Sequence, residues 1–89
     1  EDYALEKQGQ LAELGIESKL VFVRHGETYH MILWVAGKYI LDNRYGTVRS
    51  LFAVPYEFLK MKSNGKWYNI GVRHNRLILK SITTSPERK

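Results

Sequence analysis

The sequence predicts an α+β domain in which one N-terminal helix packs on an antiparallel β-sheet. Apolar residues in the first 14 positions follow a helical spacing, whereas later ones lie in short β-branched and aromatic runs separated by turn residues. No internal repeat or Pro/Gly-rich linker divides the 89 residues. We therefore expect a single domain over residues 1–84, incomplete at its N-terminus, and a flexible tail over residues 85–89.

The helix is expected over residues 2–14. Gly9 weakens it by about 1 kcal/mol, and Gly15 can end it as the residue with a positive φ after the last turn. The residues expected to face the sheet are Ala4, Leu11, Ala12 and Leu14.

Six strands are expected after the helix, because runs rich in Val, Ile, Tyr, Phe and Trp alternate with turn residues. Asn64-Gly65 is the strongest local turn and suits a type I′ hairpin. The expected strands are 19–24, 29–34, 38–42, 56–62, 66–72 and 76–82.

Residues 29–43 contain two strand-like runs that meet at a glycine, which predicts a β-hairpin. If residues 35–37 form a three-residue loop and Gly37 supplies the positive φ, Trp34 pairs with Lys38. That pairing fixes the register of the whole hairpin.

In this register His30 lies opposite Asp42 on the same face of the sheet, with Cβ atoms about 5 Å apart. A carboxylate at this distance can orient an imidazole, which supplies two members of a nucleophile, base and orienting-acid arrangement. The same contact also suits a purely structural hydrogen bond. A two-residue loop would place the two side chains on opposite faces, so the spacing alone leaves both interpretations open.

Taken in order, several segments resemble the bacterial transglutaminase-like cysteine peptidases. In that family a helix opens on a cysteine, and a His-headed strand and a Leu-Asp-Asn segment follow. The resemblance covers about residues 1–70, but the cysteine would stand just before Glu1 and the chain contains none. The matching segments are Glu1-Asp2-Tyr3, Leu14-Gly15-Ile16, His30-Met31-Ile32-Leu33, Leu41-Asp42-Asn43, Tyr56-Glu57-Phe58-Leu59-Lys60 and Lys66-Trp67-Tyr68-Asn69-Ile70.

The resemblance implies cleavage of amide bonds in a protein substrate through a thioester acyl-enzyme. His30 would be the base, Asp42 its orienting acid, and the periplasm the compartment. Because the nucleophile is absent, we expect this chain to be inactive as it stands, either as part of a longer protein or as a diverged homologue that serves as a binding module.

The resemblance also implies calcium, held by acidic residues that flank the cysteine, and Glu1 matches one of them. The upstream acidic partner of Glu1 is absent from this chain. An acidic residue in the first turn of a helix also complements the helix dipole without any metal. Both interpretations of Glu1 stay open at this point.

A competing motif is Arg24-His25-Gly26-Glu27, which resembles the Arg-His-Gly-Glu signature of the histidine phosphatases. In those enzymes the His accepts a phosphoryl group and the Arg binds it. That fold needs a much larger α/β domain with further His, Arg and acidic residues downstream. We therefore expect Arg24 and His25 to be exposed strand-end and turn residues, with phosphate chemistry as the alternative.

The formal net charge of +5 raises the question of an anionic partner. The basic residues near the end of the chain are spaced as outward-facing strand positions, so we expect a solvated sheet face rather than a nucleic-acid groove. A docking surface for an acidic protein substrate fits the same pattern. No apolar run reaches the 18 or so residues that a membrane-spanning helix needs.

Overall fold

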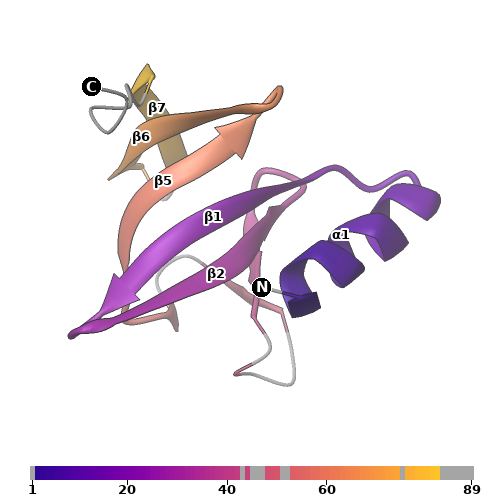
Figure 1. The fold of residues 1–89 in the computed structure, drawn as a ribbon, viewed down its shortest axis with the longest axis horizontal. Helices are drawn as coiled ribbons and strands as arrows, with labels where there is room; N and C mark the ends of the chain where they lie inside the picture. Colours follow the sequence, from indigo (N-terminus) through magenta and orange to yellow (C-terminus); the bar gives the residue numbers. More distant parts are fainter. Residues whose placement is uncertain (1, 43, 45–47, 51–52, 75, 83–89) are drawn as a thin grey trace.

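The computed structural model describes residues 2–42, 44, 48–50, 53–74 and 76–82. These residues form one helix and a seven-stranded antiparallel sheet, in the strand order β4-β3-β2-β1-β5-β6-β7 (Figure 1). The predicted α+β class is confirmed. The predicted tail, residues 85–89, lies outside the described residues.

Helix α1 (Asp2–Glu13) ends in a Schellman motif. The Ile16 amide donates to the Leu11 carbonyl at 2.9 Å, and the Gly15 amide donates to the Ala12 carbonyl at 3.0 Å. Gly15 has a φ of 78°, as the prediction for the end of the helix requires. The motif turns the chain back so that the next strand can run beside the helix.

The face of α1 that contacts the sheet passes through residues 4, 8 and 11. Ala4 is buried, Leu11 is partly buried, and the Gln8 side chain donates to the Ser18 carbonyl at 3.1 Å. The prediction that Ala12 and Leu14 face inward is wrong, because both are exposed. Ala12 is rotated away from this face, and Leu14 belongs to the capping turn.

Strand β1 lies at the centre of the sheet and pairs with β2 on one side and β5 on the other. Among the strands that the structure describes, only β4, which has two residues, has no counterpart among the predicted strands. The bounds are β1 Ser18–His25, β2 Thr28–Val35, β3 Tyr39–Leu41, β4 Arg49–Ser50, β5 Glu57–Ser63, β6 Lys66–Arg73 and β7 Arg76–Ile82.

The two faces of the sheet carry separate apolar clusters, because successive side chains of a strand point to opposite faces. Helix α1 covers one face, where Ala4 packs with Leu20, Leu33 and Val35. The other face carries the larger cluster. Its members are Val21, Val23, Ile32, Trp34, Ile40, Val54, Tyr56, Met61, Ile70 and Leu77.

The Asn64-Gly65 turn has the predicted geometry. Ser63 pairs with Lys66, and the two residues between them have φ angles of 54° and 78°. Positive φ at both central residues is the type I′ pattern, which matches the twist of the two strands. This prediction is confirmed in type and in position.

The predicted register of the β2–β3 hairpin is wrong by two residues. Trp34 pairs with Ile40 rather than with Lys38, and Val35 pairs with Tyr39. Both Ala36 (φ 55°) and Gly37 (φ 71°) take positive φ, and the Lys38 amide donates to the Val35 carbonyl at 3.0 Å. The turn therefore starts one residue later than expected, and Lys38 joins the loop. A shift of two keeps every side chain on its predicted face.

Candidate active site

The structure brings His30 and Asp42 into direct contact. Nε2 of His30, on β2, lies 2.6 Å from Oδ1 of Asp42, the residue that directly follows β3. In the observed register Leu33 pairs with Leu41, so Asp42 lies diagonally across from His30 rather than opposite it. Diagonal neighbours are within reach of a long side chain, which explains why the contact survives the change of register.

Asp42 is the buried acid of this site, with only 1% of its surface exposed. Its Oδ1 also accepts a hydrogen bond from the Arg44 amide at 3.0 Å, and its Oδ2 accepts one from the Tyr56 hydroxyl. A buried carboxylate is costly unless donors surround it. Three donors here satisfy both oxygens and fix the orientation of the carboxylate.

Burial by itself would raise the pKa of the Asp42 carboxyl, but the hydrogen bonds from Tyr56, His30 and the Arg44 amide outweigh it and hold the pKa below its ordinary value. Asp42 is therefore charged at neutral pH and can only accept hydrogen bonds. Nε2 of His30 must then carry the proton of this contact, which leaves Nδ1 as the nitrogen that can take a further proton. The His30 side chain is 28% exposed, so it is accessible from solvent.

Tyr56 is the residue of this site that the sequence does not single out. Its ring meets the His30 ring edge to face, with centroids 5.9 Å apart, and the Arg44 guanidinium lies 5.6 Å from the Tyr56 ring centroid. The segment that begins at Tyr56 matches one family landmark, which is the only signal in the sequence that could have found it. Its place beside Asp42 depends on the pairing of β1 with β5, which local patterns do not predict.

The competing motif has different partners. Arg24 pairs with Glu57 across β1 and β5, and its Nε donates to Glu57 Oε1 at 3.0 Å. His25 is exposed at the end of β1, as expected, and its Nδ1 lies 3.5 Å from Nη1 of Arg44. The Arg24 guanidinium is thus bound to a carboxylate, which would compete with a phosphate for the same donors.

The predicted metal ligand Glu1 lies outside the described residues. Within the part of the chain that the structure describes, no group of three or more His, Cys, Asp or Glu side chains could hold a metal ion. Calcium therefore stays a prediction, and no step below depends on it. In the same part of the chain, no helix has the length and apolarity needed to cross a membrane.

A buried acid behind a histidine is the arrangement found in hydrolases that use a nucleophile, a base and an orienting acid. In the comparison with protein families, the family described as bacterial transglutaminase-like cysteine proteinase (BTLCP) matches residues 1–75. The chain belongs to this family. Comparisons with curated proteins and with solved structures found no match.

Proposed function

We propose that His30 and Asp42 are the general base and the orienting acid of a cysteine peptidase that cleaves protein substrates. The observation that carries the proposal is the 2.6 Å contact between His30 Nε2 and the buried carboxylate of Asp42. Membership of the cysteine proteinase family supports the reaction class. The proposal includes a transglutaminase-like arrangement of the helix and the sheet.

The chain has no cysteine, so the proposal places the thiol ahead of Glu1, in a segment that precedes this sequence. His30 Nδ1 takes the thiol proton, and the thiolate attacks the carbonyl carbon of the scissile amide. The imidazolium then gives that proton to the leaving amine, and a thioester remains. His30 next takes a proton from a water molecule whose oxygen attacks the thioester carbonyl carbon. The C–S bond breaks, the carboxylic acid leaves, and the imidazolium returns its proton to the thiolate.

Asp42 supports both halves of this cycle. Its charge stabilises the imidazolium, and its contact with Nε2 keeps Nδ1 as the reactive nitrogen. Tyr56 and the Arg44 amide hold the carboxylate in place, so it cannot turn away when the ring becomes charged. General acid–base catalysis of this kind contributes about 10²- to 10⁴-fold to a rate.

The proposal needs a route from the tip of α1 to His30. His30 lies on the face opposite the helix, because its position alternates with Leu33 and Val35, which pack under α1. However, β3 pairs only with residues 33–35 of β2, so in the described part of the chain no strand covers the β3 side of residues 28–32. The proposal therefore requires the thiol to approach the imidazole around this edge.

The test uses the protein extended through the residues that precede Glu1 in its gene, with a cysteine directly before Glu1. We expect hydrolysis of an unfolded protein such as casein, and a thiol that iodoacetamide alkylates well below the ordinary thiol pKa of about 8.5. His30→Gln and Asp42→Asn should each lower kcat by about 10²-fold or more. His30→Gln should also return the alkylation profile toward the ordinary value.

Lys66→Gln is the control, because Lys66 is exposed at the β5–β6 turn, outside the proposed site. A chelator added to the same assay tests the prediction that Glu1 helps to hold calcium. Full activity and an unchanged alkylation profile in His30→Gln would remove the proposed base. A folded, extended protein without any hydrolysis would favour a non-catalytic binding module on the same scaffold.

A further inference from the structure

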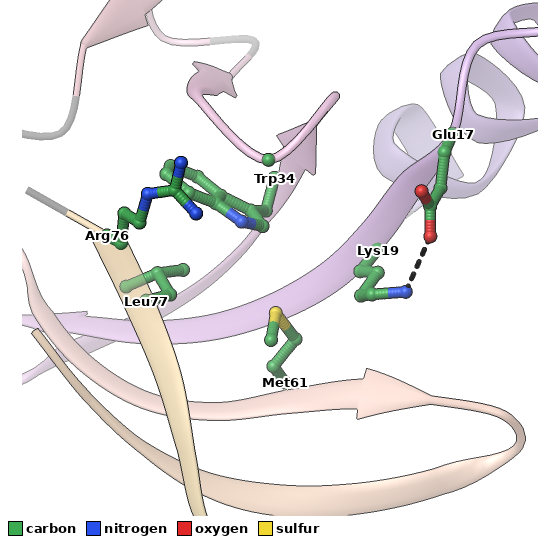
Figure 2. Close-up of a pocket in the computed structure, with 7 residues that line it drawn as sticks. Glu17, Lys19, Trp34, Met61, Arg76 and Leu77 are labelled. Atoms are coloured by element: carbon green, nitrogen blue, oxygen red, sulfur yellow. Dashed lines mark hydrogen bonds and ion pairs between the residues drawn. The ribbon is translucent and has the colours of Figure 1, made fainter.

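A hollow on the His30 face of the sheet has an apolar floor. Its volume is about 210 Å³, and Trp34, Met61 and Leu77 line it together with charged residues (Figure 2). These three side chains are 5%, 4% and 8% exposed and belong to the larger apolar cluster. The floor is therefore set by the core of the protein and does not depend on loop positions.

The rim of this hollow carries more positive than negative charge. Lys19 and Arg76 line it with a single acid, Glu17, whose Oε2 lies 2.9 Å from Lys19 Nζ (Figure 2). Arg76 is exposed, and among the described residues its guanidinium has no ion-pair partner. Its fork of donors is thus open to a carboxylate from outside the chain.

A second hollow of about 280 Å³ adjoins the first, and Gly37 and Arg76 line both. It adds Lys38 and His74 to the basic groups around Arg76. Because these residues come from the β2–β3 and β6–β7 turns, the two ends of the sheet approach each other here. Arg76 therefore stands between two hollows in a region of positive potential, which attracts acidic ligands.

The first hollow is aligned with the proposed catalytic pair. Trp34 and His30 lie on the same face of β2, four positions apart, which corresponds to about 13 Å along the strand. An extended peptide covers that distance with about four residues. Ile32, which lies between them on this face, is 1% exposed, so a substrate bound in the hollow has to pass around the packed cluster and needs more residues than that to reach His30.

We propose that this hollow binds an acidic segment of the protein substrate, with an apolar side chain on Trp34 and an adjacent carboxylate on Arg76. The segment would lie more than four residues from the cleaved bond. That the segment belongs to a substrate rests on the proposed peptidase function. The binding itself rests on the apolar floor, the open guanidinium and the excess of positive charge.

The test measures binding to the 89-residue chain in a Trp67→Phe background, where Trp34 is the remaining tryptophan. The probe is an acetylated and amidated hexapeptide, Ser-Gly-Leu-Asp-Gly-Ser, titrated while the Trp34 fluorescence is followed. We expect the Asp peptide to bind about tenfold more tightly than its Asn counterpart, because a charged hydrogen-bond partner contributes more than a neutral one. Replacing its Leu with Gly should weaken binding as well.

Arg76→Gln should abolish the preference for Asp over Asn, and Arg76→Lys should keep part of it, because the charge stays and the fork is lost. Lys66→Gln, which removes one exposed charge at the β5–β6 turn, should leave the preference unchanged. The preference should also shrink as sodium chloride is raised. Equal affinity for both peptides, an unchanged preference in Arg76→Gln, or no fluorescence response to any peptide would each overturn the proposal.

The binding test needs no thiol, so its outcome is separate from that of the peptidase assay. Charge-dependent peptide binding with an inactive extended protein would remove the proposed function and keep the hollow as an acidic-peptide site. Proteolysis without charge-dependent binding would keep the proposed function and remove the acidic-peptide site.

Discussion

Asp42 and Glu57 are both acids that contact a basic side chain on a neighbouring strand, yet their surroundings are opposite. Asp42 is almost fully buried and accepts three hydrogen bonds. The Glu57 side chain is 55% exposed, and its partner Arg24 is 41% exposed. The Asp42 carboxylate is packed inside the protein, whereas water can replace most of the contacts of the Glu57 carboxylate.

The difference shows which acid can hold its basic partner in one orientation. An exposed pair is screened by water and salt, and typically contributes about 0–1 kcal/mol to stability. A buried acid with every oxygen satisfied keeps its partner in one orientation, and removing it leaves several donors without an acceptor. The contrast predicts a graded series of effects.

The largest effect is expected from Asp42→Ala. The substitution leaves the Tyr56 hydroxyl, the Arg44 amide and His30 Nε2 without their acceptor, so the free energy of unfolding should fall by about 3 kcal/mol or more. Urea denaturation followed by far-UV circular dichroism measures it. The matched control is Glu57→Ala, and a similar loss in both variants would show that the burial of Asp42 has no energetic meaning.

Tyr56→Phe should come next. The ring keeps its packing, but Oδ2 of Asp42 loses its donor in a buried setting, so we expect a loss of about 2 kcal/mol. The same change should raise the pKa of Asp42, because one of the hydrogen bonds that lower it is gone. Carboxyl carbon NMR shifts followed through an acid titration report that pKa directly, and an unmoved titration would contradict the role of Tyr56.

Acid should then weaken the protein in a way that depends on Asp42. Its pKa is lowered in the folded state, so the unfolded chain takes up the proton first, near the ordinary value of about 4. The contribution of Asp42 is complete above that pH and is lost as the pH falls through the folded-state pKa. The effect should be smaller than that of Asp42→Ala, since a protonated carboxyl still accepts from Tyr56.

The pH effect is measured as the free energy of unfolding between pH 2 and pH 6, and Asp42→Asn should flatten its slope. Glu17 provides the comparison, because its hydrogen bond and ion pair with Lys19 also lower its pKa while the side chain stays exposed. In 1 M salt the Asp42-dependent slope should persist and the Glu17-dependent one should disappear. Loss of both in salt would contradict the difference in burial.

The smallest effect is expected from Glu57→Gln. The Arg24 guanidinium can turn to water, so the free energy of unfolding should change by less than about 1 kcal/mol, and the change should vanish at high salt. Thermal unfolding at two salt concentrations is sufficient. A salt-independent loss of several kcal/mol would place this pair in the same category as Asp42.

The sequence predicts most of what depends on neighbours along the chain. Alternation locates the long strands, Asn64-Gly65 fixes its turn, and Gly15 ends the helix. In the β2–β3 turn, by contrast, Gly37 marks only one of the two residues with positive φ, and nothing in the sequence shows that Ala36 takes the other. The contact of His30 with Asp42 could still be predicted, because a slip of two residues preserves the face.

The rest of the site depends on pairings between distant segments. Strand β5 pairs with β1 across more than 30 intervening residues, and this pairing brings Tyr56 to Asp42. The hydrogen bond from Arg44 to Asp42 comes from a backbone amide, so the residue type at position 44 does not predict it. The hollow proposed to bind an acidic peptide is likewise lined by Trp34 and Arg76, which come together only because the sheet is curved.

The order of the strands divides the sheet into two halves joined along β1, and the halves share the site unequally. His30 and Asp42 both belong to the half made of β1 to β4, while the Tyr56 hydroxyl arrives with the half that begins at β5. A partial opening that detaches β5 to β7 would leave His30 and Asp42 together on one hairpin. Asp42 would, however, lose its hydrogen bond from the Tyr56 hydroxyl. The orientation of the His30 ring therefore depends on the pairing of β5 with β1. Substitutions at that pairing can make the ring more mobile without contacting it.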